Sequence, residues 1–227
     1  MTKAYGLIFD VDGVIADTEG VNAQASIQMF EDLFGVKGVK REDFEAGIGR
    51  GAEAYVKAAA AVHGVEFTDE QVAEATEVRQ VNFLKLLKQE PLPAFAGVLE
   101  LMHEAMKADD FSVAIATSST REKSEAVLKS AKIPYESMVY ITGSEVKNKK
   151  PHPELFLLAA ERMGIEPKNC VVIEDAPNGV QAAKAAGAKC IAVTNTTDAA
   201  NLSGSDLICD SLEQVDLETI TRLIETG

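Results

Sequence analysis

Short apolar runs alternate with helix-like segments along most of the chain, and this alternation constrains the fold more than any other feature of the sequence. The runs that we interpret as buried strands are residues 4–9, 113–116, 139–142, 170–173, 190–193 and, more weakly, 207–209. The helix-like segments between or after them include 153–163, 178–186 and 213–224. Because strands that alternate with helices form a mostly parallel sheet covered on both faces, we predict a doubly wound α/β core.

One long interval breaks this alternation. After the first strand the sequence holds only helix-like segments, at 23–34, 41–46, 52–63 and 69–88. The stretch 90–97 contains two prolines and a glycine, which do not fit inside one helix, so it closes the interval. We therefore predict an all-helical domain at 17–92, inserted into an α/β core domain formed by 1–16 and 93–227.

Composition narrows the classes of partner. The 227 residues include 22 Lys and Arg against 36 Asp and Glu, a net charge of −14 that repels phosphate backbones and anionic lipids. We expect no nucleic acid or membrane partner, since no apolar run approaches the roughly 20 residues that span a bilayer. The cysteines (Cys170, Cys190 and Cys209) form no C-x-x-C pair and are typical of buried thiols in a reducing compartment.

The N-terminus carries no basic segment followed by an apolar one, so the sequence predicts a cytoplasmic protein, or an organellar stromal one if a transit peptide was removed. A monomer is the favoured oligomeric state.

Polar residues follow several of the predicted strands. The first strand is followed by Asp10-Val11-Asp12-Gly13, the second by Thr117-Ser118-Ser119 and the fourth by Glu174-Asp175, and Lys149-Lys150-Pro151 lies between the last two. The carboxyl ends of parallel strands meet at one edge of a sheet, where ligands gather. Carboxylates that converge there need a cation, and all-oxygen ligands suit Mg²⁺. A hydroxyl-bearing turn and a lysine supply what a phosphoryl group needs, namely hydrogen-bond donors and positive charge.

Each of these pieces also has an ordinary structural explanation. A lone D-x-D commonly marks a turn or a helix cap, and the hydroxyls at 117–120 can cap a helix that begins near Arg121. Lys149-Lys150 can be a solvated loop, and Glu174-Asp175 a surface turn. Four such coincidences at one edge of one sheet are less expected than one active site.

Together these motifs resemble a known family. Asp10-Val11-Asp12-Gly13-Val14, Thr117-Ser118-Ser119, Lys150-Pro151 and Ile173-Glu174-Asp175-Ala176-Pro177-Asn178-Gly179-Val180 are similar to the four motifs of the haloacid dehalogenase-like (HAD) hydrolase superfamily. The helical insertion resembles the cap of its phosphoglycolate phosphatase and β-phosphoglucomutase branch, and Asp17-Thr18-Glu19 resembles that branch's first hinge. The resemblance covers the whole chain and implies a Rossmann-like core with a helical cap domain.

The resemblance also implies catalytic roles. Asp10 would be the nucleophile that forms an aspartyl phosphate, and Asp12 the general acid and base. Thr117 and the Ser118 backbone N–H would bind phosphoryl oxygens, and Lys150 would pair with both Asp10 and the phosphoryl group.

A metal site is implied as well. The Asp10 carboxylate, the Asp12 backbone carbonyl and Asp175 would hold Mg²⁺, and Glu174 would support the metal site through the ligands or through a water. An acid at position 12 further argues against a haloalkanoate dehalogenase, whose leaving group needs no proton.

Cap residues are expected to set the substrate. Glu19, Asn22 and Arg50 are candidate substrate contacts in the insertion, and Arg121 is a candidate just after the second motif. Many relatives have a histidine at the position of Asn22, and glucomutases have a lysine at that of Ala46. This sequence lacks both side chains.

The sequence therefore predicts a Mg²⁺-dependent phosphomonoester phosphatase that acts on a small phosphorylated metabolite, with sugar phosphates as the leading class. A β-phosphoglucomutase-like phosphosugar mutase is the alternative. A non-catalytic phosphoacceptor signalling domain is a third hypothesis, because receiver domains also combine a doubly wound sheet, clustered acids, a hydroxyl and a lysine. The helical insertion and the acid at position 12 argue against that third hypothesis.

Overall fold

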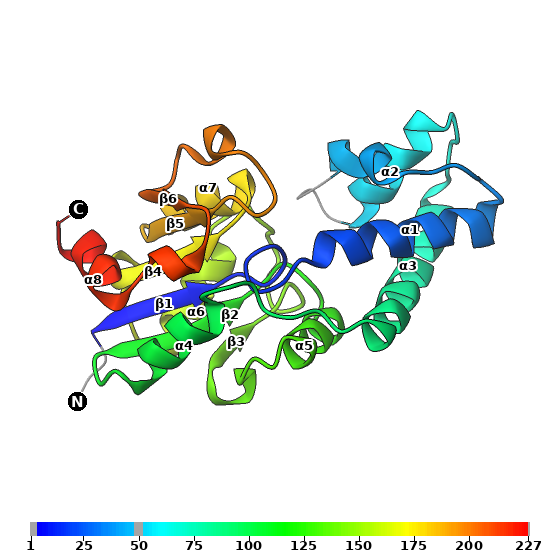
Figure 1. Ribbon diagram of the computed structural model, residues 1–227. Helices are drawn as coiled ribbons and strands as arrows, with labels where there is room; N and C mark the ends of the chain where they lie inside the picture. The colour runs from blue at the N-terminus through cyan, green and yellow to red at the C-terminus, as the bar shows by residue number, and fades with distance from the viewer. Residues whose placement is uncertain (1–3, 48–51, 227) are drawn as a thin grey trace. The chain divides into compact units, whose positions relative to one another are not determined.

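The computed structural model describes residues 4–47 and 52–226, and these divide into two compact units (Figure 1). The first unit, called the core unit here, comprises the chain up to Asp17 and from Leu92 onward. The second, called the helical unit, is Thr18–Pro91. That the helical unit acts as a cap domain with a hinge at its borders stays a prediction.

The core unit contains one six-stranded sheet in which every neighbouring pair is parallel. Its strands are β1 (Tyr5–Phe9), β2 (Phe111–Ala116), β3 (Val139–Ile141), β4 (Cys170–Glu174), β5 (Lys189–Val193) and β6 (Leu207–Cys209). They lie in the order β3-β2-β1-β4-β5-β6. The predicted doubly wound, Rossmann-like α/β core is confirmed.

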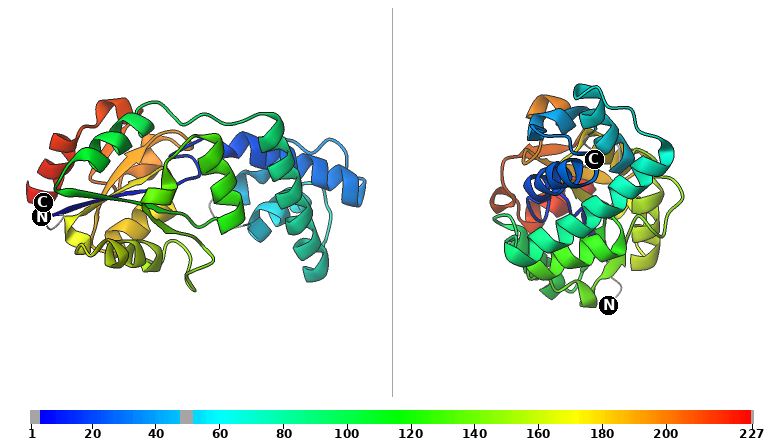
Figure 2. Two further views of the ribbon diagram at one scale, coloured as in Figure 1. Left: turned by 90° about the horizontal axis from the view of Figure 1, so that it is seen from below. Right: turned by 90° about the vertical axis from the view of Figure 1, so that its right-hand side faces the viewer.

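Helices cover both faces of this sheet. They are α4 (Val98–Lys107), α5 (Arg121–Ser130), α6 (Glu154–Met163), α7 (Pro177–Ala185) and α8 (Leu217–Thr226). Figure 2 shows the sheet between α4 and α8 on one side and α6 and α7 on the other. Side chains of alternate strand residues such as Ile8, Ala114 and Val172 pack with α6 and α7. The apolar runs are continuous because both faces of the sheet are buried.

The strand order places a topological switch point between β1 and β4. From β1 the chain moves outward through β2 to β3, and it then returns to β4 and moves outward in the opposite direction. Phe9 pairs with Ile173, so the residues after β1 and at the end of β4 lie next to each other. Open α/β sheets bind ligands at such a point.

The helical unit has a separate core of aliphatic and aromatic side chains. It consists of α1 (Thr18–Phe34), the 3-10 helix η1 (Arg41–Gly47), α2 (Ala52–Val62) and α3 (Asp69–Gln89). The Phe44 and Tyr55 rings stack at 4.6 Å between centroids, and the Phe34 and Phe67 rings lie 4.2 Å apart. Thr68 begins α3 with a capping box, which satisfies backbone N–H groups at the helix start.

The structure differs from the sequence-based expectations at several elements, and α1 begins at Thr18, five residues before the predicted start. The predicted helix 213–224 is a short 3-10 helix, η5 (Leu212–Gln214), followed by α8, because the Asp216 carboxylate accepts a hydrogen bond from Thr219 N and starts a new helix. The predicted helix 41–46 is the 3-10 helix η1, and β2 begins two residues earlier than predicted. In the described part of the chain, every helix is too short or too polar to span a bilayer.

Candidate active site

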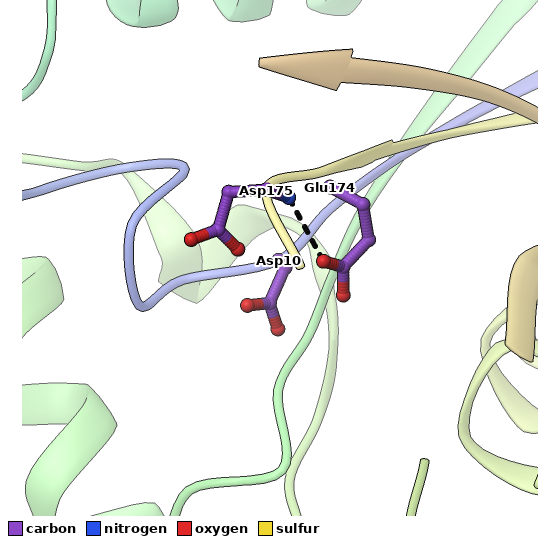
Figure 3. Close-up of side chains that lie close together, drawn as sticks. All are labelled: Asp10, Glu174 and Asp175. Atoms are coloured by element: carbon purple, nitrogen blue, oxygen red, sulfur yellow. Dashed lines mark hydrogen bonds between the residues drawn. The ribbon is translucent and has the colours of Figure 1, made fainter. Parts of the chain in front are cut away.

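Three buried carboxylates meet where β1 and β4 end. Asp10, Glu174 and Asp175 each offer an oxygen within 4.8 Å of the others (Figure 3). The Asp10 N–H donates to Ile173 O at 3.1 Å, which extends the β1–β4 pairing by one residue and fixes the place of Asp10 beside Glu174. The parallel register therefore brings together two motifs that are far apart in the sequence.

Lys150 supplies a buried positive charge to this cluster. Its ammonium donates to Asp10 Oδ1 at 2.8 Å and to Glu174 Oε1 at 2.5 Å, and its side chain is only 10% exposed. Burial alone would lower the pKa of Lys150, but the Asp10 and Glu174 carboxylates raise it above its ordinary value. Lys150 therefore stays protonated and places a positive charge beside the carboxylates at the ends of β1 and β4.

One cation does not neutralise three carboxylates. Burial raises the pKa of Asp10 to about 7; Lys150 acts in the opposite direction, and the Glu174 and Asp12 charges add to the rise. Burial and the Glu174 and Asp10 charges also raise the pKa of Asp175 well above its ordinary value. Ionising all three carboxyl groups is therefore costly without a further cation.

Backbone donors hold Glu174 in place. Its Oε2 accepts hydrogen bonds from the N–H groups of Asp175 at 2.9 Å and Ala176 at 3.0 Å, next to the start of α7. A Cβ at position 179 would overlap the Glu174 carboxylate, which explains why glycine follows in this motif. The carboxylate therefore lies in a cradle formed by its own strand-to-helix turn.

The turn after β5 also reaches the cluster, which the sequence analysis missed. Thr196 donates to Asp175 Oδ2 at 2.6 Å, and Asn195 donates to the Gly13 carbonyl at 2.8 Å. Gly13 has a φ of 77°, and a Cβ there would overlap the Asp175 carboxylate. The signal was present in the sequence, since Thr194-Asn195-Thr196 is a polar run directly after a predicted strand.

Two side chains donate hydrogen bonds to the Asp12 carboxylate, and the sequence did not predict either contact. Ser119 donates to Asp12 Oδ2 at 2.6 Å, and the Lys123 ammonium donates to Asp12 Oδ1 at 3.1 Å. Ser119 belonged to a motif that the sequence analysis quoted, but nothing local singled out Lys123. The turn after β2 and the first turn of α5 therefore both reach the loop after β1.

The same turn carries the predicted phosphoryl-binding groups. Thr117 is buried, its N–H donates to Ile141 O at 3.1 Å, and its Oγ1 accepts from Ser119 N at 3.1 Å. Ser118, the next residue along the chain, is half-buried. Both residues follow β2, which is the direct neighbour of β1 in the sheet.

The donor set fits Mg²⁺. It consists of oxygens from three buried carboxyl groups, and Gly13 leaves the space that a side chain would fill beside Asp175. Hard divalent cations prefer oxygen ligands of this kind.

The remaining candidates lie on α5, in the helical unit or outside the described residues. The Arg121 guanidinium donates to Glu145 Oε2 at 3.1 Å and lies over the Tyr140 ring. In the helical unit, Glu19 Oε1 accepts a 2.6 Å hydrogen bond from the Tyr55 hydroxyl.

Asn22 lies half-buried on α1, where its backbone carbonyl accepts from the Ser26 hydroxyl. Arg50 lies outside the residues that the structure describes. The roles of all four residues in substrate binding stay predictions.

Comparison with known proteins identifies the class to which this site belongs. The model of the haloacid dehalogenase-like hydrolase family matches residues 7–193. Hexitol phosphatase A of Escherichia coli is 31% identical over 220 residues, covering 97% of this chain and 95% of its own length. The crystal structure of CbbY from Rhodobacter sphaeroides in complex with xylulose-1,5-bisphosphate is similar, with a TM-score of 0.83 at 26% identity, covering 96% of this chain and 99% of the other.

A third relative is much longer. The chloroplastic protein SUPPRESSOR OF QUENCHING 1 of Arabidopsis thaliana is 34% identical over 221 residues, which are 96% of this chain but 21% of that protein. This chain therefore spans about a fifth of that relative's length.

The chain belongs to the haloacid dehalogenase-like hydrolases, in the branch that contains phosphoglycolate phosphatases and β-phosphoglucomutases. Within that family it is a phosphoric monoester hydrolase.

Proposed function

We propose that this chain is a Mg²⁺-dependent phosphatase that removes the phosphoryl group of a small sugar phosphate through an aspartyl phosphate on Asp10. The observation that carries the proposal is the buried Lys150 ammonium, which bonds Asp10 and Glu174 at once. An ammonium in this position orients the nucleophile and lies where a phosphoryl oxygen needs positive charge.

In the first half-reaction an Asp10 oxygen attacks phosphorus in line. The bond from phosphorus to the ester oxygen breaks, and the leaving oxygen takes a proton from Asp12. Thr117 and the Ser118 N–H bind the phosphoryl oxygens during this transfer. Covalent catalysis of this kind divides one difficult hydrolysis into two easier steps.

In the second half-reaction a water attacks the phosphorus of the aspartyl phosphate. Asp12 takes the proton of that water, and the bond between phosphorus and the Asp10 oxygen breaks to release inorganic phosphate. Asp12 thereby returns to the protonation state from which it started, so one residue performs both proton transfers.

Mg²⁺ would be held by the Asp10 carboxylate, the Asp12 carbonyl and Asp175, with support from Glu174. When bound, the metal supplies positive charge that offsets the carboxylates and the phosphoryl oxygens. The buried acidic cluster and the raised pKa values of Asp10 and Asp175 support this assignment.

The substrate class rests on the relatives. Hexitol phosphatase A is named for a sugar alcohol phosphate, and CbbY was crystallised with a ketopentose bisphosphate. A small sugar phosphate or polyol phosphate is therefore the leading class for this chain.

A turnover assay tests the proposal. Hydrolysis of p-nitrophenyl phosphate should require Mg²⁺ and vanish after treatment with EDTA. A panel of sugar and polyol phosphates, compared by kcat/KM, then identifies the preferred ester. An acyl phosphate that forms without turnover would contradict hydrolysis and favour a phosphoacceptor signalling domain.

The mutase alternative needs a different assay. β-Glucose 1-phosphate is supplied with catalytic glucose 1,6-bisphosphate, and glucose 6-phosphate and inorganic phosphate are both measured. Asn22 and Ala46 replace the histidine and lysine expected of a glucomutase, so phosphate release should be faster. Faster formation of glucose 6-phosphate would instead support a mutase.

A further inference from the structure

Lys123 occupies a place in α5 where a lysine is unfavourable. It lies in the first turn, and its N–H donates to the side chain of the N-cap residue Thr120. The positive end of the helix dipole and the unpaired backbone N–H groups both disfavour a cation there. Its side chain is only 15% exposed, whereas that of Lys129 in the last turn of the same helix is 63% exposed. A half-buried lysine at a helix N-terminus needs a compensating partner.

Asp12 is that partner. Lys123 Nζ lies 3.1 Å from Asp12 Oδ1, and Ser119 Oγ lies 2.6 Å from Asp12 Oδ2, so each carboxylate oxygen has its own donor. Lys123 Nζ also donates to Ser119 Oγ at 3.5 Å, which links the two donors to each other. The three side chains form a closed set of contacts between the loop after β1 and the start of α5.

These contacts restrict how the Asp12 carboxylate can turn. A carboxylate held at one oxygen can rotate about that contact, but one held at both oxygens by separate elements cannot. Local rules for helix composition are broken most often where a site requires it. The unfavourable position of Lys123 therefore points to a role at Asp12 rather than to helix stability.

We propose that Lys123, together with Ser119, is a positioning residue that orients the Asp12 side chain, whose carboxyl group in its protonated form gives a proton to the leaving oxygen. This inference rests on the proposed function, in which Asp12 is the general acid. Lys123 acts through Asp12. Its effect on the rate should therefore be largest for esters whose leaving oxygen must be protonated. Proton transfer requires hydrogen-bond reach, so a misplaced carboxylate loses most of its effect.

Two aryl phosphates of similar shape test the proposal. Phenol is a weak acid, comparable to tyrosine with a pKa of about 10, so phenyl phosphate needs protonation of its leaving oxygen. p-Nitrophenol is much more acidic, so p-nitrophenyl phosphate has little need of it. The measurement is kcat/KM, which reports the steps up to the first irreversible one and therefore includes cleavage of the ester.

Lys123→Met keeps the aliphatic stem and removes the charge. We expect kcat/KM for phenyl phosphate to fall about 10- to 100-fold, while that for p-nitrophenyl phosphate falls only about 2-fold. Lys123→Arg keeps a cation and should lose less than Lys123→Met. Ser119→Ala removes the second donor and should likewise lose more activity on phenyl phosphate than on p-nitrophenyl phosphate. It serves as the second test variant if Lys123→Met does not fold. Lys129→Met is the matched control on the same helix and should leave both substrates unchanged.

The outcomes separate this inference from the proposed function. Equal losses on both substrates, or no loss on either, in a folded Lys123→Met or Ser119→Ala protein would overturn the positioning role. Wild-type turnover of p-nitrophenyl phosphate that is dependent on Asp10 would still support the proposed function in that case. Absence of any such turnover would refute the proposed function itself.

Discussion

The two units of this protein bury different kinds of side chain. Every carboxyl group that is buried among the described residues belongs to the core unit, namely Asp10, Glu174 and Asp175. The described core of the helical unit is aliphatic and aromatic, and the polar residues buried there are uncharged. The buried carboxyl groups are therefore concentrated in the core unit, and the helical unit is stabilised by apolar packing.

The difference has a physical cause. A parallel sheet aligns the carboxyl ends of its strands, so polar turns from β1, β2, β4 and β5 meet at one edge, next to the N-terminus of α7. The described part of the helical unit contains only helices and loops, and its helices pack through Phe30, Phe44 and their neighbours. We therefore expect substitutions in the core unit to affect the chemical step, and those in the helical unit to affect substrate choice or stability.

The largest expected effect is that of Asp10→Asn. The amide has the shape of the carboxylate but cannot act as an anionic nucleophile, so turnover of every phosphate ester should be lost. The measurement is kcat with p-nitrophenyl phosphate and a sugar phosphate, with circular dichroism to show that the fold is retained. Activity close to wild type in a folded variant would refute the assignment of Asp10 as nucleophile.

Asp12→Asn should have the next largest effect. Loss of the general acid and base should slow hydrolysis of a sugar phosphate by about 10²- to 10⁴-fold. The loss of kcat/KM should be smaller for p-nitrophenyl phosphate, because its leaving group needs little protonation. An identical loss for both esters would show that Asp12 does not protonate the leaving oxygen.

The buried charge of the core unit predicts a pH-dependent response to Mg²⁺. The pKa of Asp10 is about 7 in the fold, above its ordinary value of 3.8, so the metal-free protein loses stability as pH rises through this window. Mg²⁺ competes with the proton, and its affinity should fall about 80-fold between pH 7.5 and pH 5, because the ionised fraction of Asp10 falls by that factor. A concentration that stabilises by about 2.7 kcal/mol at pH 7.5 should therefore stabilise by only about 0.5 kcal/mol at pH 5.

Thermal unfolding with and without Mg²⁺ at the two pH values measures this response. Sodium chloride of equal ionic strength is the control for general screening. Equal stabilisation by Mg²⁺ at both pH values would contradict binding at the buried carboxylates.

The smallest expected effect lies in the helical unit and has a matched control in the core unit. Tyr55→Phe removes a 2.6 Å hydrogen bond to Glu19, and Tyr5→Phe removes one of the same length to Glu225. Each variant should lose about 1 kcal/mol of stability or less. Since Glu19 is a candidate substrate contact, only Tyr55→Phe should change KM for a sugar phosphate, and neither should change turnover of p-nitrophenyl phosphate. If both variants keep the KM of the wild-type protein for the sugar phosphate, Glu19 is not a substrate contact.

Much of the core unit could be predicted because its signals are local. Apolar runs predicted all six strands to within about two residues, and the polar residues after three of them predicted Asp10, Thr117 and Glu174 as neighbours. The error at 213–224 arose from Asp216, whose capping role is visible only once the helix start is known. The start of α1 at Thr18, five residues before the predicted one, also shows that polar residues in a first turn hide a helix boundary.

The sequence by itself determined the class of fold, the edge of the sheet where the carboxylates gather, and the lysine that accompanies them. It did so because strand periodicity and strand ends are properties of consecutive residues. Only the tertiary structure decided that β5 lies beside β4, which brings Thr196 to Asp175, and that α5 points Lys123 at Asp12. Strand order and the direction of a helical side chain depend on packing between distant segments, and no local pattern encodes them.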